Sequence, residues 1–185
     1  MDTNKKYIAL GLMSGTSADG VDASIIETDG YTISKHFGGA FTPYTPQKMA
    51  CIKHAYGKDA DTSHASDIVT DVHIDAITHC LRTLDINIAD IDVIGFHGQT
   101  TYHAPQYGVT IQIGSPQKIA TTFNTNVIAD FITNDVINGG EGAPLYHNAI
   151  CKEFGTVFLN LGGWQILPSA CLIISPPLTL DPLMH

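Results

Sequence analysis

A loop of small and polar residues, GLMSGTSADGVD (Gly11–Asp22), lies between two apolar segments near the amino end of the chain. The flanking segments, Tyr7–Met13 and Val21–Glu27, have the composition of β-strands. Because glycine has no side chain, a loop of this kind lets backbone N–H groups come close to a phosphate. We therefore expect a β-hairpin whose loop binds phosphate, with an ordinary turn as the alternative.

The segments that follow predict an α/β fold. After a turn at Asp29-Gly30, Tyr31–Phe37 is expected to form a third antiparallel strand. Beyond it, apolar spacing and proline positions predict helices at Pro46–Tyr56, Ser63–Leu84 and Ser115–Asn124. Further strands are expected at Asp92–Phe96, Val109–Ile113, Asn126–Ala129 and Val157–Leu161. This order is typical of a mixed sheet with helices on its faces.

The charge balance limits the classes of partner. The chain has 185 residues, 44% of them hydrophobic, which suits one domain or a fragment of a larger one. Nine Lys and Arg residues against 18 Asp and Glu residues give a formal charge of −9. We therefore expect no nucleic-acid partner and no anionic membrane surface. A phosphate ligand would be held by backbone amides or by a metal ion.

Targeting signals and disulfide patterns are not apparent. The chain has no apolar run near the roughly 18–20 residues that cross a bilayer, and Tyr7–Met13 is too short for the core of a signal peptide. The four cysteines are widely spaced and form no C-x-x-C pair, which favours reduced thiols. The expected location is the cytoplasm.

A second polar segment, HGQTTYHAP (His97–Pro105), follows the expected strand Asp92–Phe96. Ligand groups in α/β sheets lie at such strand ends. His97 can hydrogen-bond a sugar hydroxyl or carry a proton near neutral pH, and a histidine bonded within its own turn is the alternative. A metal site of His97 and His103 is disfavoured, because the sequence shows no paired acid or third ligand nearby.

A third polar segment, ADFITNDVINGGEGAPL, covers residues 129–145. Asp130 follows an expected strand, and Asp135 falls in an expected helical turn. The Gly139–Pro144 loop is suited to close over a ligand with Glu141 at its rim, or else is a surface connection between elements.

Over Tyr7–Gly163 the chain resembles the anhydro-N-acetylmuramic acid kinases in segments that occur in the family's order: GLMSGTSADGVD, IGFHGQTTYHAP, TIQIGSP, VIADF…DV…GGEGAPL and FLNLGG. The resemblance implies a ribonuclease-H-like lobe of the actin/Hsp70/hexokinase ATPase superfamily, with the second lobe missing from this chain. That family transfers the γ-phosphate of ATP to O6 of 1,6-anhydro-N-acetylmuramic acid while water attacks C1 and opens the anhydro ring. The product, N-acetylmuramic acid 6-phosphate, is an intermediate of murein recycling.

The resemblance also implies the site residues. The ATP-binding residues would be Gly15, Thr16, Ser17, Ala18, Asp19, Gly20, Val21 and Asp22. The sugar-binding residues would be His97, Gln99, Thr100 and Asp130. Mg²⁺ is expected with ATP, because phosphoryl transfer needs a neutralisation of charge that a site poor in lysine does not supply, but no metal-ligating residues are assigned. The resemblance thus implies ATP and an amino sugar as partners. For intact members of the family it also allows a homodimer.

Two positions depart from the family pattern. Ile132 stands where family members usually carry an arginine, which could pair with the lactyl carboxylate of the sugar. Losing such a charged hydrogen bond typically costs about 1.5–3 kcal/mol of binding free energy. Tyr146-His147-Asn148 also replaces a stretch that usually contains proline.

The largest departure follows Gly163. Family members continue with I-A-N and then F-D-T-G-P-[GA]-N, whose aspartate is the expected general base, whereas Trp164–His185 contains neither motif. Codons can be chosen that encode this tail in its own reading frame and encode A-N and F-D-T-G-P-A-N-A in the frame that starts one base earlier. Both missing motifs of the family can therefore be present in one shifted frame. We therefore hypothesise a frameshift, with residues 1–163 as the kinase lobe and 164–185 as a non-native tail.

Three functional hypotheses result. The first is a sugar kinase by family, with no catalytic residue assigned in this chain and with the chain inactive alone. The second is a non-catalytic remnant that still binds a ligand. The third, a metal-dependent hydrolase using His97, His103 and Asp130, is disfavoured.

The frameshift hypothesis makes a prediction about the coding DNA. Read one base earlier from about the Gly163 codon, the DNA should encode F-D-T-G-P near the position of Leu178-Thr179. Sequencing this region and the DNA downstream checks it. A shifted frame without that motif contradicts the hypothesis.

Overall fold

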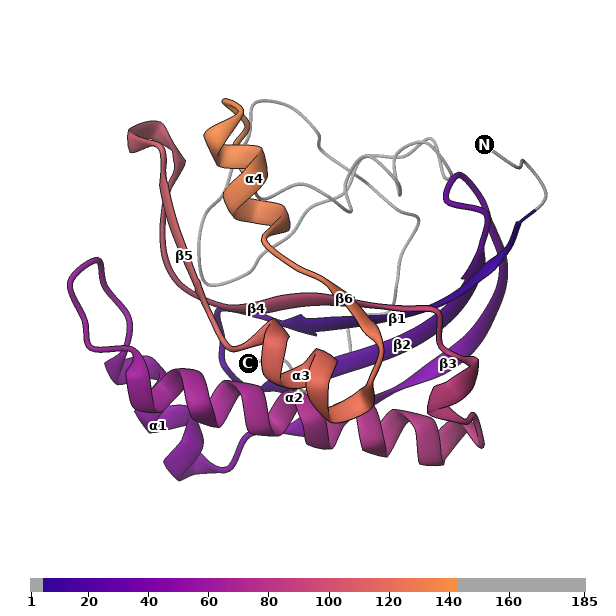
Figure 1. Cartoon of the computed structure of the whole chain (residues 1–185). Coiled ribbons are helices and arrows are strands. Elements are labelled where there is room, and N and C mark those ends of the chain that lie inside the picture. Colours follow the sequence, from indigo (N-terminus) through magenta and orange to yellow (C-terminus); the bar gives the residue numbers. More distant parts are fainter. Residues whose placement is uncertain (1–4, 143–185) are drawn as a thin grey trace, which may run out of the picture.

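The computed structural model describes residues 5–142, which form a mixed sheet with helices packed against it (Figure 1). The six strands are β1 (Tyr7–Ser14), β2 (Gly20–Thr28), β3 (Ile33–Pro43), β4 (Val93–Ala104), β5 (Val109–Ile113) and β6 (Asn126–Ile128). Their order across the sheet is β3-β2-β1-β4-β5, and β6 pairs separately with β4.

Strand directions divide the sheet into two parts. β1, β2 and β3 form the expected antiparallel meander. β4 is parallel to both β1 and β6, and antiparallel to β5. Because the parallel neighbours β1 and β4 need a long crossover, the chain between them contains β2, β3 and two helices. The predicted mixed α/β sheet flanked by helices is confirmed.

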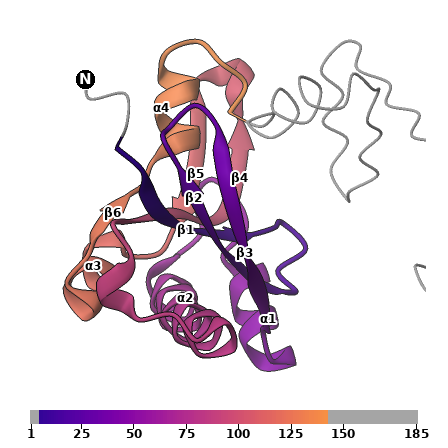
Figure 2. The ribbon, with the colours of Figure 1, turned by 90° about the vertical axis from the view of Figure 1, so that its right-hand side faces the viewer.

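The helices begin where the sequence offers caps and prolines. The four α-helices are α1 (Pro46–His54), α2 (Ser63–Leu84), α3 (Pro116–Phe123) and α4 (Phe131–Ile137), and short 3-10 turns occur at Ile88–Asp90 and Pro105–Tyr107. The side chains of Thr45 and Ser115 cap α1 and α3 by accepting backbone N–H groups, with proline at the start of each helix. Figures 1 and 2 show α1, α2 and α3 on one face of the sheet and α4 on the other side, beside β5.

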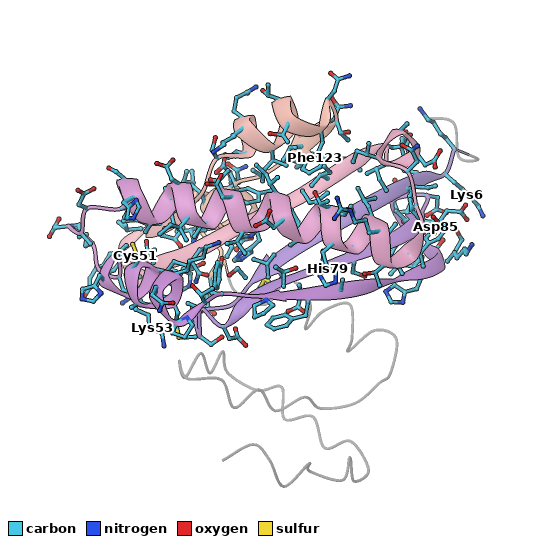
Figure 3. The ribbon with its side chains drawn as sticks, turned by 90° about the horizontal axis from the view of Figure 1, so that it is seen from below. Lys6, Cys51, Lys53, His79, Asp85 and Phe123 are labelled. Carbon is cyan, nitrogen blue, oxygen red and sulfur yellow. The ribbon has the colours of Figure 1, made fainter. Side chains whose placement is uncertain are left out.

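The core lies between the sheet and α2. Alternate residues of β1 and β2 are buried on this face, including Leu10, Val21 and Ile25. They join a cluster with the buried stripe of α2, which includes Val69 and Ile77. The view from below in Figure 3 shows α2 lying across the strands.

A polar contact ties the middle of α2 to the edge strand. His79 Nδ1 lies 3.2 Å from Thr42 Oγ1 of β3, at the side of the helix labelled in Figure 3. The last turn of α2 also packs on β3, because a Cβ at Gly38 would lie 2.8 Å from Leu84 Cδ2. Glycine at this position lets the edge strand and the helix approach.

Two expected strands have different bounds. The third strand begins at Ile33 instead of Tyr31, because Asp29 Oδ1 accepts the N–H groups of Tyr31 and Thr32 and so extends the turn. It also continues past Phe37 to Pro43, since β2 supplies a partner along its whole length. The remaining helix and strand predictions within residues 5–142 agree with the structure to within a few residues at each end, except for β4.

The fourth strand runs to Ala104, well beyond the expected end at Phe96. Its second half, Gln99–Ala104, pairs with β5. The polar segment after Phe96 is therefore the second half of a strand and not a loop at its end.

Some expectations fall outside the described residues. These are the strand Val157–Leu161, the end of the Gly139–Pro144 loop, the substituted stretch at residues 146–148 and the tail 164–185. Within residues 5–142, no helix combines the length and apolarity needed to cross a bilayer.

A histidine of α2, His73, has its ring buried in the hydrophobic core. His73 of α2 is fully buried, its Nδ1 lies 2.7 Å from Val69 O, and its ring packs edge-on against Phe96. Within the described residues its Nε2 has no hydrogen-bond partner. Burial lowers the pKa of His73 to about 4, the bond to Val69 opposes this shift, and the charge of nearby His97 adds to it.

We predict that acid destabilises the fold through His73. Its folded pKa is about 4 against 6.5 for the free side chain, so the unfolded chain binds more protons between these values. The contribution of His73 to the free energy of unfolding should be constant above pH 6.5 and fall by about 3 kcal/mol as the pH approaches 4. Urea unfolding of His73→Leu between pH 7 and pH 5 should show a flatter dependence, whereas His64→Gln, at an exposed site on the same helix, should keep it. Identical slopes for wild type and His73→Leu would refute the assignment.

Candidate functional site

The loop between β1 and β2 is a tight turn with an exposed rim. Ala18 N–H donates to Gly15 O at 3.0 Å and closes the turn. Ala18 is fully buried and has a φ of +52°, a left-handed conformation that a small side chain tolerates better than a β-branched one. Thr16, Ser17 and Asp19 are exposed, so the rim presents backbone and hydroxyl donors together with one carboxylate.

Several backbone donors on this rim are unused. Among residues 5–142, no acceptor is bonded to the backbone N–H groups of Thr16, Ser17 and Asp19. Ser17 Oγ donates to Asp19 Oδ1 at 2.6 Å, and Tyr44 N–H donates to Asp19 O at 2.9 Å. The loop is thus fastened at Asp19 while its first two N–H groups stay available.

The remaining expected ATP-binding residues lie at the start of β2. Gly20 and Val21 are buried, so they can meet a ligand only through the backbone. Asp22 is exposed, and alternation along β2 places it on the sheet face opposite the helices. A Cβ at Gly20 would lie 2.6 Å from Thr42 O, so the loop can pass β3 only with glycine here.

A buried amide supports the loop from below. Gln99 of β4 is fully buried, and its Oε1 accepts from Ser14 Oγ at 2.6 Å. Its Nε2 donates to Gly15 O at 2.9 Å and to Tyr56 Oη at 3.1 Å. Ser14 Oγ also lies 3.2 Å from Tyr44 Oη. The amide therefore joins the end of β1 to β4 and to the segment after α1.

Tyr56 completes this support. Its Oη donates to Thr16 O at 2.8 Å. Burial raises the pKa of Tyr56 to about 12, and the neighbouring Tyr44 adds to the shift. Tyr56 is therefore a protonated phenol at physiological pH and can act as a donor to the loop.

A bend in β4 sets the positions of the expected sugar-binding residues on that strand. Phe96 still pairs with β1, whereas Gln99 already pairs with both β1 and β5. Between them Gly98 has a φ of +72°, and a Cβ there would lie 2.7 Å from Ile113 O. Glycine is required at this bend, where the strand leaves the main sheet for the β4–β5 hairpin.

His97 lies inside β4, and Asp130 follows the end of β6. The last pair between these two parallel strands is Gly95 with Ile128, and His97 and Asp130 each lie two residues beyond it. His97 is half-buried with Nδ1 2.8 Å from Gly98 O, the local bond that we gave as the alternative, and Asp130 is exposed. The structure thus brings these two expected sugar-binding residues to the same sheet edge.

Gln99 and Thr100 are placed differently. Gln99 faces the β1–β2 loop, as described above, and Thr100 Oγ1 accepts from Gln112 Nε2 at 3.3 Å. Gln112 Oε1 in turn accepts from Thr133 Oγ1 of α4 at 3.1 Å. The side chains of Gln99 and Thr100 are almost fully buried, which favours supporting roles over direct contact with a sugar.

The glycine loop after α4 folds back on that helix. Asp135 Oδ2 accepts from Gly142 N–H at 2.7 Å, and Gly140 N–H donates to Asp135 O at 2.8 Å. Ile132 is buried, and a Cβ at Gly142 would lie 2.6 Å from its Cγ2. The position where an arginine was expected from the resemblance is therefore an apolar contact under this turn, and Glu141 is exposed.

Sequence reasoning missed the residues that act from a distance. Tyr44, Tyr56 and Gln112 were assigned no role, although each bonds to a candidate site segment. Gln112 carried a signal, since it is a polar residue inside the short strand pattern VTIQI. The two tyrosines carried none, because their contacts join segments far apart in the chain.

The described residues do not support the hydrolase alternative. In the range 5–142, no three His, Cys, Asp or Glu side chains form a group able to hold a metal ion. His103 Nδ1 lies 3.0 Å from Thr110 Oγ1 in the β4–β5 hairpin.

Comparison with known proteins assigns the family. The family model described as "Anhydro-N-acetylmuramic acid kinase" matches residues 6–172. The chain belongs to this family. Similar proteins with this name include those of Roseobacter denitrificans, 43% identical over 84% of this chain and 41% of the relative, and Azorhizobium caulinodans, 40% identical over 84% and 46%. That of Methylorubrum extorquens is 37% identical over 90% of this chain and 51% of its own.

The match covers only part of the length of each relative. The chain spans about half the length of the curated relatives it matches, for example 47% of the kinase of Agrobacterium fabrum. Among solved structures, YeaZ from Pseudomonas aeruginosa matches with a TM-score of 0.36 and 11% identity, covering 81% of this chain and 50% of that chain. This likeness is too low to add to the family assignment.

The bend in β4 gives a matched pair of variants. Gly98→Ala should lower the free energy of unfolding by about 2–4 kcal/mol, because it adds a clash with Ile113 O to an unfavourable left-handed φ. Gly108→Ala has nearly the same φ of +67° but no neighbour within 4 Å, so it should cost only about 1 kcal/mol. Chemical unfolding measures both, and equal losses would show that β4 does not bend tightly at Gly98.

Proposed function

We propose that this lobe supplies the phosphate-binding loop of an ATP-dependent kinase that acts on 1,6-anhydro-N-acetylmuramic acid. The observation that carries the proposal is that, within residues 5–142, the Thr16 and Ser17 N–H groups have no acceptor, on a fastened loop at the end of β1 in a chain of this kinase family. Backbone donors are the appropriate means of phosphate binding for a chain with a formal charge of −9.

The nucleotide would bind along residues 15–22. The backbone N–H groups of Thr16 and Ser17 and the two hydroxyls would meet phosphate oxygens, while Gly20 and Val21 contribute only backbone. Because these donors are held in place before the ligand arrives, little conformational entropy is lost on binding.

The residues of this loop fit Mg²⁺ held mainly by ATP. Mg²⁺ is usually bound by one or two carboxylates together with phosphates and water. Asp19 and Asp22 are both exposed at the loop, although Asp19 Oδ1 also accepts from Ser17. When bound, Mg²⁺ would neutralise charge on the transferring phosphate.

His97 and Asp130 are the side chains that we propose face the sugar. His97 could hydrogen-bond a hydroxyl, and Asp130 offers an exposed carboxylate at the neighbouring strand end. Gln99 and Thr100 would hold the segments behind them. Phosphate transfer to O6 with water attack on C1 also needs a base for that water, and the family's F-D-T-G-P motif does not occur in the printed sequence. A kinase of this class would act in the cytoplasm, where ATP is present.

We predict that the chain binds ATP without turning it over. Titration with Mg²⁺ and ATP, followed by nuclear magnetic resonance of the backbone amides, should shift signals at residues 15–22. Thr16→Glu should weaken binding by about tenfold or more, because it places a negative charge beside the phosphates. Thr121→Glu, an exposed threonine on α3, is the control and should bind as wild type does. Signals that move elsewhere, or unchanged affinity in Thr16→Glu, would contradict the proposed site.

Turnover and sugar binding separate the two family hypotheses. A coupled assay of ADP release with the anhydro sugar should show no activity of the chain alone, and normal turnover would overturn that expectation. Titration with the sugar, with and without ATP, tests the alternative of a ligand-binding remnant. Sugar binding without any ATP binding would favour that alternative.

A further inference from the structure

We propose that Gln99 and Tyr56 are positioning residues that aim the phosphate loop outward. They do so by holding two backbone carbonyl groups of the loop toward the interior. This inference rests on the proposed function for its consequence in ATP binding, but the positioning itself is a property of the free chain.

The argument starts from the planar peptide group. In a trans peptide, the C=O of one residue and the N–H of the next point in opposite directions. The carbonyl of Gly15 therefore fixes the direction of the Thr16 N–H, and the carbonyl of Thr16 fixes that of the Ser17 N–H. Anchoring these oxygens inward directs both N–H groups outward.

The structure anchors these same two oxygens. Gly15 O accepts from Gln99 Nε2 at 2.9 Å, and Thr16 O accepts from Tyr56 Oη at 2.8 Å. Within residues 5–142, the Thr16 and Ser17 N–H groups are among the loop donors that have no acceptor. Each of the two anchored peptides thus presents a donor that is unused within these residues.

The anchors themselves are fixed by further bonds. Gln99 Oε1 accepts from Ser14 Oγ at 2.6 Å, which sets the orientation of the amide so that its NH₂ faces the loop. Gln99 Nε2 also donates to Tyr56 Oη at 3.1 Å, which leaves the phenol proton to point at Thr16 O. Ser14 Oγ also lies 3.1 Å from Gly20 O, but Gly15 O and Thr16 O can only accept, so the amide and phenol donors stay directed at these two loop carbonyls.

The network also joins the two parts of the proposed site. Gln99 follows the Gly98 bend, between His97 and Thr100 of β4. The strand that carries the sugar-side histidine therefore also carries the side chain that sets the phosphate loop.

Two variants test the proposal. Tyr56→Phe removes the hydroxyl that donates to Thr16 O and keeps the ring. Gln99→Met removes both polar atoms of the side-chain amide, Oε1 and Nε2, at similar volume. Each should weaken binding of Mg²⁺-ATP to the folded chain by about tenfold. Each should also speed hydrogen exchange at the Ala18 amide, which donates to Gly15 O, by roughly tenfold.

Two controls separate positioning from general destabilisation. Ile77→Val weakens the fully buried core without touching the network, and Tyr107→Phe changes an exposed tyrosine. A purely structural role would make Tyr56→Phe and Gln99→Met behave like Ile77→Val, with a lower melting temperature but unchanged ATP affinity under conditions where the chain is fully folded. That result would overturn the proposal.

The two proposals fail in different ways. If the wild-type chain binds no ATP, the proposed function of the loop is wrong, but exchange at Ala18 still decides whether Gln99 and Tyr56 position it. If the wild type binds ATP at the loop and both variants keep its affinity and its Ala18 exchange rate, the positioning role alone is wrong.

Discussion

Parallel hydrogen bonding between β1 and β4 places the end of β1 beside the bend in β4, although the two segments are far apart in the sequence. Ser14 at the end of β1 is paired with Gln99 of β4, and the buried contact between their side chains follows from that register. The β1–β2 loop, the β4 bend and the Asp130 strand end all depend on this pairing. If β4 slipped by one residue, Gln99 would turn to the other face and the loop would lose its support.

The site combines a rigid interior with an exposed surface poor in positive charge. Gln99, Tyr44 and Tyr56 are neutral groups, so their burial costs less than that of an ion pair and is offset by mutual hydrogen bonds. A lysine in the loop would attract phosphate more strongly but would have no comparable partner among these groups. Backbone donors that a neutral hydrogen-bond network holds in place are therefore a suitable means of phosphate binding for a lobe with more acidic than basic residues.

Local sequence patterns were sufficient for most of the fold. The periodicity of Ser63–Leu84, the prolines that begin α1 and α3, and the flanks of Gly11–Asp22 each depend on neighbours in the chain. The lengths of β3 and β4 could not be read locally, because the second half of β4 is a strand only in the presence of β5. The polar segment HGQT was recognised as important, but its alternation around the Gly98 bend, which turns Gln99 inward, follows from tertiary pairing. Tyr56 had no signal at all, since its role depends on a contact with Thr16, distant in the sequence.

The pairing of Ala9 with Val93 has a consequence for how the chain folds during synthesis. The β1–β2–β3 meander and its helices can begin to form while the ribosome is still making the middle of the lobe. One long edge of β1 then has no partner until β4 has emerged, and nascent strand edges of this kind are prone to aggregation. Contacts between such distant residues also slow folding, so the β1 edge stays open until β4 docks beside it.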